Sequence, residues 1–127
     1  MNVGELLQAI NGKLLVPDVD LKRQVRGGCG ADLMSDVLAS IQQPDGVLVT
    51  GLCNPQVVRT AAMADMAAIV LVRGKKPPSE TVELAAREGL PLISTPFGMF
   101  DICGKLYQTG MASLEKPVSE DEYSCDS

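Results

Sequence analysis

Apolar residues recur at helical spacing near the start of the chain. The apolar positions of this first segment follow the spacing i, i+3, i+4 and i+7, namely Val3, Leu6, Leu7 and Ile10. That spacing predicts an amphipathic helix, which Asn11-Gly12 ends. A short strand is predicted over residues 13–16, where Pro17 stops it. Residues 18–28 are ambiguous and contain a weak strand near 24–27.

The second half of the chain contains three continuous apolar runs, at residues 46–51, 67–74 and 90–95. Runs without polar alternation are typical of strands that are buried on both faces. A helical pattern follows each of them, at residues 54–66, 79–89 and 98–110. This alternation predicts right-handed crossovers on a parallel sheet. The expected fold is α/β, a three-layer α/β/α sandwich with a small, mostly parallel sheet that the N-terminal strands extend at one edge.

Three of the predicted helices have recognisable ends or buried faces. The helix over 30–42 is expected to bury one apolar stripe, made of Leu33, Met34, Val37, Leu38 and Ile41. Asn54 is placed to cap the next helix, with Pro55 as its first residue. Ser79 is expected to cap the helix over 79–89, and Gly89 to end it. The inward positions of that helix are Val82, Ala85 and Ala86.

The chain is expected to form one domain over residues 1–112, followed by a tail over 113–127. A chain of 127 residues is long enough to bury an independent core. From Ser113 onward the sequence is polar and acidic and has no apolar period. Such a composition predicts a flexible tail that contributes little to the fold.

Charge and composition exclude several classes of protein. The net charge of −5 disfavours a nucleic-acid-binding protein, which normally has a basic face. No apolar run approaches the length of about 18 residues that spans a membrane, and the N-terminus lacks the pattern of a signal peptide. We therefore expect a cytoplasmic protein without membrane partners. The four cysteines contain no Cys-x-x-Cys pair, and a disulfide framework is not expected.

A Gly-Lys pair at Gly74-Lys75 follows one buried run and precedes a helix, as in phosphate-binding loops. The rest of the Walker A pattern is missing, because Ile69 stands where its first glycine belongs and Lys76 replaces the Ser or Thr that binds magnesium. Pro77-Pro78 also prevents the loop from continuing directly into a helix. A phosphoryl-transfer loop is therefore not expected. The turn is either an anion-binding group of cations or a solvated basic turn.

The loops after the three buried runs are the predicted ligand site. In open α/β sheets, ligands bind at the carboxyl ends of the strands. Each of these loops carries groups suited to a small anion, and the candidate residues are Thr50, Gly51, Asn54, Arg73, Gly74, Lys75 and Thr95. The alternative is that the glycines and prolines here only make tight turns.

Three stretches carry a resemblance to a known family: GADLMSDVLA, GVLVTGLCNPQVVRTAAMADMAAIVLVRGKKPP and LAAREGLPLISTPFGMFDICGKLY. They resemble the DRTGG-domain family over roughly Val3 to Met111, and its stand-alone members most closely. The family takes its name from an Asp-Arg and a Thr-Gly-Gly motif, and this chain lacks both. Cys53-Asn54 stands in the place of Asp-Arg, and Arg73-Gly74-Lys75 in the place of Thr-Gly-Gly.

The resemblance implies a fold similar to the N-terminal domain of HPr kinase, without that enzyme's catalytic domain. It also implies a regulatory, dimer-forming module, with relatives that occur beside CBS domains in pyrophosphatases. Stand-alone members occur in gene clusters with iron-only hydrogenase or NADH-dehydrogenase-like subunits, which implies a redox-enzyme partner.

The leading functional hypothesis is a non-catalytic regulatory or sensor module. It would bind a small anionic metabolite, such as a nucleotide, or a protein partner, and it would need no cofactor and no metal. A second hypothesis is a metal or iron–sulfur site, built from thiols of Cys29, Cys53 and Cys103 that meet at one edge. A third is an acid–base enzyme that uses some of the carboxylates of Asp32, Asp36, Asp65 and Asp101.

Overall fold

The structure is a computed structural model that describes residues 1–124. Residues 125–127, which include Cys125 and the end of the predicted tail, lie outside the described residues. The helices are α1 (Val3–Ala9), α2 (Met34–Ser40), α3 (Pro55–Met63), α4 (Ser79–Glu88) and α5 (Met99–Gln108). The strands are β1 (Lys13–Leu14), β2 (Gly27–Gly30), β3 (Gly46–Thr50), β4 (Ala68–Leu71), β5 (Leu92–Ser94) and β6 (Ala112–Ser113). A short 3₁₀ helix, η1 (Glu120–Glu122), follows.

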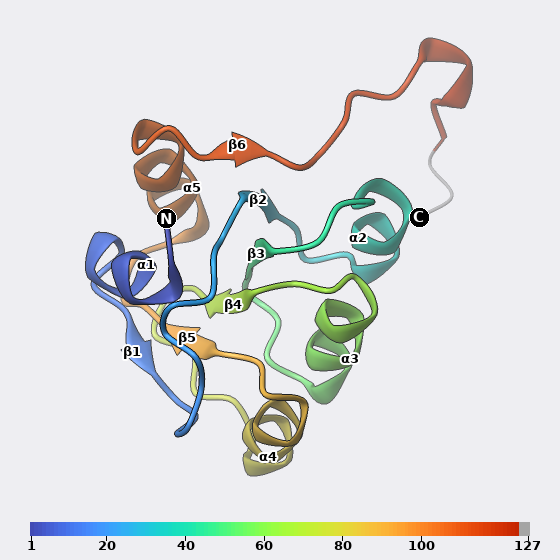
Figure 1. Ribbon diagram of the computed structural model, residues 1–127. Helices are drawn as coiled ribbons and strands as arrows, with labels where there is room; N and C mark the ends of the chain where they lie inside the picture. The colour runs from blue at the N-terminus through green and yellow to red at the C-terminus, as the bar shows by residue number, and fades with distance from the viewer. Residues whose placement is uncertain (125–127) are drawn as a thin grey trace.

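The strands form one mostly parallel sheet in the order β1-β5-β4-β3-β2-β6. Strands β2 to β5 run parallel to their neighbours, β6 runs parallel to β2, and β1 runs antiparallel to β5. From β2 to β5, each strand lies on the same side of the strand that precedes it in the chain. Because the connections between parallel strands are right-handed, the helices within them all lie on one face of the sheet. Helices α2, α3 and α4 cover that face, and α1 and α5 cover the other (Figure 1). The expected three-layer α/β/α sandwich is confirmed.

The central strands divide their side chains between the two faces because successive side chains of a strand point in opposite directions. Leu48 and Ile69 pack toward α3 and α4, while Val49 and Val70 pack toward α1 and α5. Every residue of β3 and β4 is buried. The continuous apolar runs in the sequence therefore predicted these two strands correctly, including their burial on both faces.

The region around β2 and α2 differs from the prediction. The weak strand expected near 24–27 begins only at Gly27 and continues to Gly30, so the helix expected over 30–42 is shortened to Met34–Ser40. This shorter helix buries Val37, and the following Ile41 is also buried. Leu33 and Leu38 were expected in the buried stripe, but they are 40% and 42% exposed. β2 ends at Gly30 and residues 31–33 connect it to α2, so Leu33 lies before the helix, while Leu38 lies on an exposed face of it.

Helix α4 also differs from the prediction at its start and on its inner face. Pro78 occupies the cap position and Ser79 is the first helical residue. Ala85 is buried and Val82 is partly buried, but Ala86, which was expected to point inward, is exposed. Thr81 takes its place in the core, where its hydroxyl donates a hydrogen bond of 2.9 Å to the carbonyl of Cys53. Gly89 ends the helix in the left-handed conformation with φ of 66°, as predicted.

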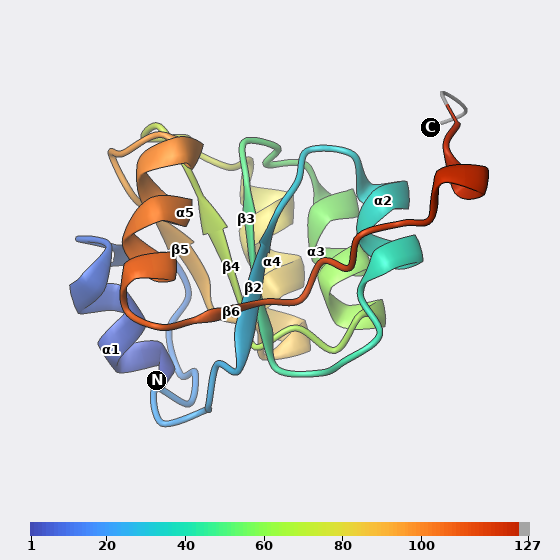
Figure 2. The same cartoon turned by 90° about the horizontal axis from the view of Figure 1, so that it is seen from above.

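Residues 112–115, called the strap below, cross the outer edge of β2 (Figure 2). The expected domain boundary after residue 112 falls inside β6, which continues to Ser113. The Leu114 amide donates to the carbonyl of Gly28 at 2.9 Å, and the Glu115 carboxylate accepts from the amide of Gly30 at 3.1 Å. We therefore propose that the folded domain ends after Glu115.

The Leu114 side chain lies over a hollow that two glycines create. A Cβ atom built on Gly27 would come within 2.7 Å of Leu114, and one built on Gly46 within 2.4 Å. Real Cβ atoms do not approach side chains this closely, so both positions need glycine if Leu114 is to stay in place. The two glycines and the leucine therefore form one packing unit between the edge strands and the strap.

Candidate functional site

The predicted ligand residues lie at one edge of the sheet, where β2 to β5 end (top of Figure 2). The loops after β3, β4 and β5 are neighbours there, because these strands are adjacent in the sheet. The helices that follow them begin at the same edge and present their amide ends to it. The structure thus brings the seven predicted residues to one edge, where they form two separate groups.

The first group surrounds the Arg73-Gly74 turn. Both residues are left-handed, with φ of 62° for Arg73 and 65° for Gly74. The amide of Arg73 donates to the carbonyl of Phe97, and the amide of Gly74 donates to the carbonyl of Thr95, both at 2.8 Å. The turn is therefore fixed to the loop that precedes α5, while the side chains of Arg73 and Lys75 remain exposed.

Thr95 anchors that loop to the end of α1. Its side chain is 1% exposed, and its hydroxyl donates a 2.7 Å hydrogen bond to the carbonyl of Ile10. The same oxygen accepts from the amide of Phe97 at 3.4 Å. Thr95 therefore holds the loop in place and does not present its hydroxyl to solvent.

Lys105 adds a further cation that the sequence reasoning missed. Its ammonium group lies over the ring of Phe97, 4.9 Å from the ring centroid. Phe97 thus contacts both cationic residues. Its carbonyl accepts the hydrogen bond from the amide of Arg73, and its ring lies under the ammonium group of Lys105. Gly98, which has no side chain to act as a cap, begins α5 beside them. The signal in the sequence was the aromatic residue before a helix with a lysine two turns later.

The second group surrounds Thr50 and already holds a carboxylate. Asp32 accepts hydrogen bonds from the Thr50 hydroxyl at 3.0 Å and from the Gly51 amide at 2.8 Å. Asn54 begins α3 as its cap residue without a side-chain capping bond, and it is exposed. Two of the groups expected to bind an external anion here, the Thr50 hydroxyl and the Gly51 amide, therefore already bind the protein's own carboxylate.

The sequence pattern that defines the DRTGG domain matches residues 5–109, which is most of the chain. The protein belongs to the DRTGG-domain family. Its fold resembles a crystal structure of the CBS and DRTGG domains of the regulatory region of Clostridium perfringens pyrophosphatase, complexed with the activator diadenosine tetraphosphate. The TM-score is 0.62 at 11% sequence identity, over 97% of this chain and 52% of the other. This chain therefore spans about half the length of the structure that it matches. No curated protein matches its sequence.

The cysteines of this DRTGG domain do not form the site that the second hypothesis requires. Cys29 lies within β2, not in a loop after a strand, and it packs on the α2 and α3 side of the sheet. Cys103 packs on the α5 side, and Cys53 lies in the loop before α3. Within residues 1–124, no group of three or more Cys, Asp or Glu side chains is arranged to hold a metal ion.

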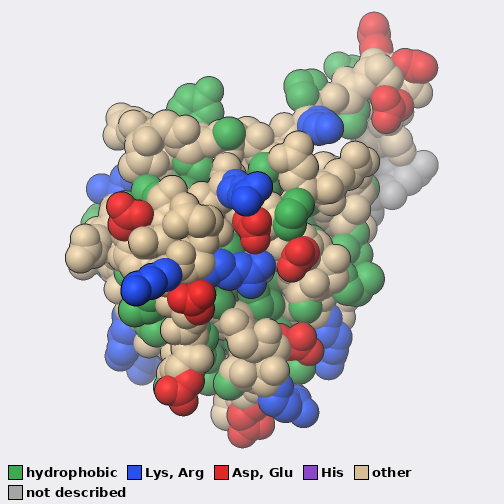
Figure 3. Space-filling model, in the orientation of Figure 1, with side chains coloured by type: hydrophobic (Ala, Val, Ile, Leu, Met, Phe, Trp, Pro, Cys, Tyr) green, Lys and Arg blue, Asp and Glu red, His purple; other side chains and the backbone are tan. Residues whose placement is uncertain are grey.

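The four carboxylates of the third hypothesis are likewise distributed over the DRTGG domain. Asp32 and Asp36 line a common pocket of about 210 Å³ beside Glu115. Asp65 lies at the opposite edge, 3.5 Å from Arg23, and Asp101 is exposed on α5. On the face that Figure 3 shows, acidic and basic side chains are interspersed and form no continuous basic patch.

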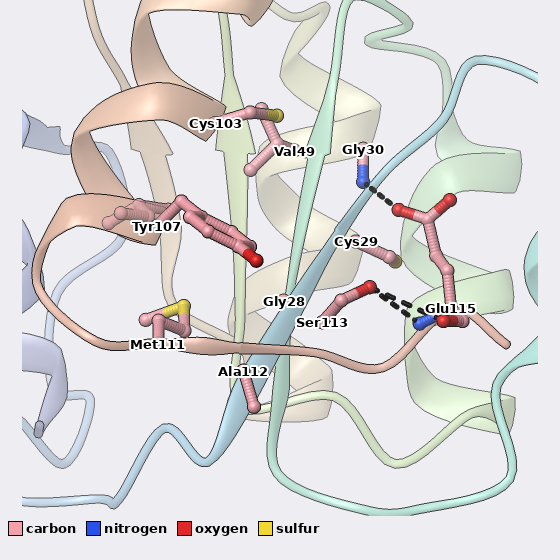
Figure 4. Close-up of a pocket in the computed structure, with 11 residues that line it drawn as sticks. Gly28, Cys29, Gly30, Val49, Cys103, Tyr107, Met111, Ala112, Ser113 and Glu115 are labelled. Atoms are coloured by element: carbon pink, nitrogen blue, oxygen red, sulfur yellow. Dashed lines mark hydrogen bonds between the residues drawn. The ribbon is translucent and has the colours of Figure 1, made fainter.

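A small pocket lies at the edge of the sheet between β2, α5 and the strap (Figure 4). Its volume is about 110 Å³, and its lining includes Cys29, Cys103, Tyr107 and Glu115. Burial raises the pKa of the Cys29 thiol to about 12, and the negative charge of Glu115 and the Cys103 thiol add to this effect. Burial and Glu115 also raise the pKa of Cys103. Both thiols therefore stay protonated at neutral pH and are poor nucleophiles and poor metal ligands.

We expect the raised pKa of Cys29 to make the DRTGG domain less stable above about pH 9. The unfolded thiol loses its proton near the ordinary value of 9.0, while the folded thiol keeps it up to about pH 12. The folded state then binds more protons, so the free energy of unfolding falls with rising pH, by at most about 1.4 kcal/mol per pH unit. Urea unfolding at a series of pH values between 8 and 11 measures this slope.

The slope should become shallower in Cys29→Ala. This variant also leaves a cavity, but that cost is the same at every pH and does not alter the slope. An unchanged slope in Cys29→Ala would contradict the assigned role of Cys29.

Within residues 1–124, no helix combines the length and the apolar character needed to cross a membrane.

Proposed function

We propose that this DRTGG domain is a non-catalytic regulatory module that binds a small anionic metabolite, such as a nucleotide, at the Arg73–Lys75 turn. The observation that carries the proposal is the fixed cationic group around Phe97. The backbone of Arg73 is hydrogen-bonded to Phe97, and Lys105 lies over the ring of the same residue. Lys75 follows in the same exposed turn, next to the start of α5.

This arrangement suits a phosphate group for two reasons. Arginine and lysine make charge-assisted hydrogen bonds to phosphate oxygens, and arginine can bind two of them at once. The first amides of a helix also favour negative charge, and α5 begins beside the turn. The backbone of the turn is held by bonds of 2.8 Å to Phe97 and Thr95, so the backbone that carries the cations needs little rearrangement before a ligand binds.

The remaining predicted ligand residues have different parts in the proposal. Thr95 and Gly74 position the turn through the hydrogen bonds described above, and the buried hydroxyl of Thr95 does not contact the ligand. Thr50, Gly51 and Asn54 form a second candidate position, which an anion can enter only after Asp32 moves away. The related regulatory region that carries diadenosine tetraphosphate supports a nucleotide as the first ligand to test.

Replacement of Arg73 and Lys75 by alanine is expected to weaken the binding of a phosphorylated ligand by about two to four orders of magnitude. Each lost charge-assisted hydrogen bond costs about 1.5–3 kcal/mol, which corresponds to this range for the pair. Calorimetric titration of both proteins with ATP and with diadenosine tetraphosphate measures the change.

A matched control removes two positive charges elsewhere. Lys22 precedes β2 and Arg87 lies in the last turn of α4, so both lie toward the opposite edge of the sheet and are exposed. The Lys22→Ala, Arg87→Ala protein should bind as the unmodified protein does. If both double variants bind the ligand equally weakly, the loss of affinity comes from the change in net charge and not from a site at the Arg73–Lys75 turn. If the unmodified protein binds neither ligand, a purely protein-binding role becomes the better hypothesis.

Three further properties follow from the family resemblance and stay predictions: a homodimer, a redox-enzyme partner, and similarity to the N-terminal domain of HPr kinase. The cytoplasmic location, which was expected from the pattern of the sequence, also stays a prediction. The absence of catalysis is part of the proposal. It is supported by the regulatory setting of the related domain and by the raised pKa of the Cys29 and Cys103 thiols, which makes both of them poor nucleophiles.

A further inference from the structure

Helix α5 begins with a large aromatic side chain that almost nothing covers. Phe100, the second residue of α5, is 92% exposed, the largest exposed fraction among the large apolar side chains of residues 1–124. The described part of the tail leads away from α5 toward α2 (Figures 1 and 2), so it does not cover the start of this helix. A ring that stays in water adds nothing to the stability of the domain, but its open faces are available to a flat group of a ligand.

The ring lies at the same end of α5 as the cationic turn. Gly98, the cap residue of α5, lies against the side chain of Arg73, because a Cβ atom built on this glycine would be 3.9 Å from Cγ of Arg73. Phe100 follows two residues later, which is about 3 Å along a helix axis. The Cα–Cβ bonds of a helix tilt toward its N-terminus, so the Phe100 side chain leans toward the edge that carries the turn.

The neighbouring Phe97 does not offer an open ring of this kind. It is half-buried and packs on the core beneath α1 and α5. The ammonium group of Lys105 lies over its ring, 4.9 Å from the centroid. The two phenylalanines therefore differ, since Phe97 supports the cations of the turn and Phe100 leaves its ring free beside them.

We infer that Phe100 stacks on the base of a nucleotide whose phosphates bind the Arg73–Lys75 turn. This inference rests on the proposed function and deepens it, because it assigns the ligand to the nucleotides and not to phosphorylated metabolites without an aromatic base. The exposed carboxylate of Asp101, next to Phe100, disfavours a phosphate on this part of α5, which leaves the phosphates at the turn and the base at the ring. Stacking on an aromatic side chain tolerates every base, since each base has a flat π-face.

Calorimetric titrations with ATP and with inorganic tripolyphosphate test the base contact. Both ligands carry three linked phosphates, but only ATP has a base. Phe100→Ser is expected to weaken the binding of ATP by about 5- to 150-fold, which is the range that stacking of one base on an aromatic side chain gives. The same variant should bind tripolyphosphate within about threefold of the unmodified protein, because it keeps the cations of the turn.

Two further variants determine whether the aromatic ring at this position is the cause. Phe100→Tyr keeps the ring and should bind ATP within about threefold of the unmodified protein. Tyr123→Ser is the matched control, since it removes an aromatic side chain that is 70% exposed but lies in the tail. It should leave the binding of ATP unchanged. Circular dichroism verifies that each variant is folded.

The outcomes separate this inference from the proposed ligand site. If the unmodified protein binds both ligands and Phe100→Ser weakens neither, the inference is overturned while the cationic site stands. Equal weakening of ATP and tripolyphosphate by Phe100→Ser would also overturn it, because the ring would then act on the phosphate site and not on a base. If the unmodified protein binds neither ligand, the proposed ligand site fails and the inference fails with it.

Discussion

Val70→Asp is expected to prevent the chain from folding. Val70 is fully buried in β4, where it pairs with Val49 of β3 on one side and Ile93 of β5 on the other. Its side chain lies in the apolar layer beneath α1 and α5, so a carboxylate there would have neither water nor a cation as a partner. An unpaired buried charge costs several kcal/mol, which is comparable with the roughly 5–15 kcal/mol that stabilises a domain. Urea unfolding followed by circular dichroism should show no cooperative transition.

Two further variants determine whether the charge is the cause. Val70→Ala should still fold and lose only about 1–4 kcal/mol, because it creates a cavity without burying a charge. Val118→Asp introduces the same carboxylate at a residue that is 56% exposed, and it should change stability by no more than about 0.5 kcal/mol. A Val70→Asp protein that unfolds cooperatively at ordinary urea concentrations would refute the central position of β4.

Removal of residues 112–127 is expected to cost about 3–5 kcal/mol. The truncated chain loses the packing of Leu114 over Gly27 and Gly46 and the hydrogen bonds that Gly28 and Gly30 make with the strap. Burial of a leucine contributes about 2 kcal/mol and each backbone hydrogen bond about 1 kcal/mol. The edge of β2 also becomes exposed, which favours aggregation. Urea unfolding of the truncated and complete chains measures the difference.

Truncation after Lys116 is the matched control. It removes the acidic remainder of the tail but keeps the strap, so stability should change by less than about 1 kcal/mol. The sequence alone led to the expectation that residues from Ser113 onward contribute little, and the two truncations decide between that boundary and the one after Glu115. Similar stability of both truncated proteins would favour the earlier boundary.

The sequence by itself determined the central part of this protein. The apolar runs at β3, β4 and β5 had no polar alternation, which only strands buried on both faces tolerate, and their regular alternation with helices left a parallel sheet as the simple solution. Local chemistry also determined two helix ends. Pro55 can begin a helix but not continue one, and Gly89 can adopt a left-handed conformation at little cost.

The family resemblance came from those same strands and helices, and the comparisons confirm it. The candidate edge was also predictable, because the carboxyl ends of parallel strands lie together in any such sheet. The sequence therefore identified the loops to consider before any contact within them was known.

Only the tertiary structure decided which groups in those loops remain available. Thr50 and Gly51 bind the carboxylate of Asp32, which comes from a different loop, and the Thr95 hydroxyl bonds to Ile10, which is far away in the sequence. No local pattern encodes such pairings, because they depend on strand order and register. The same reason explains why β2 was assigned poorly. Its glycines carry no apolar signal, and they form a strand only because β3 lies on one side and the strap, from the other end of the chain, lies on the other.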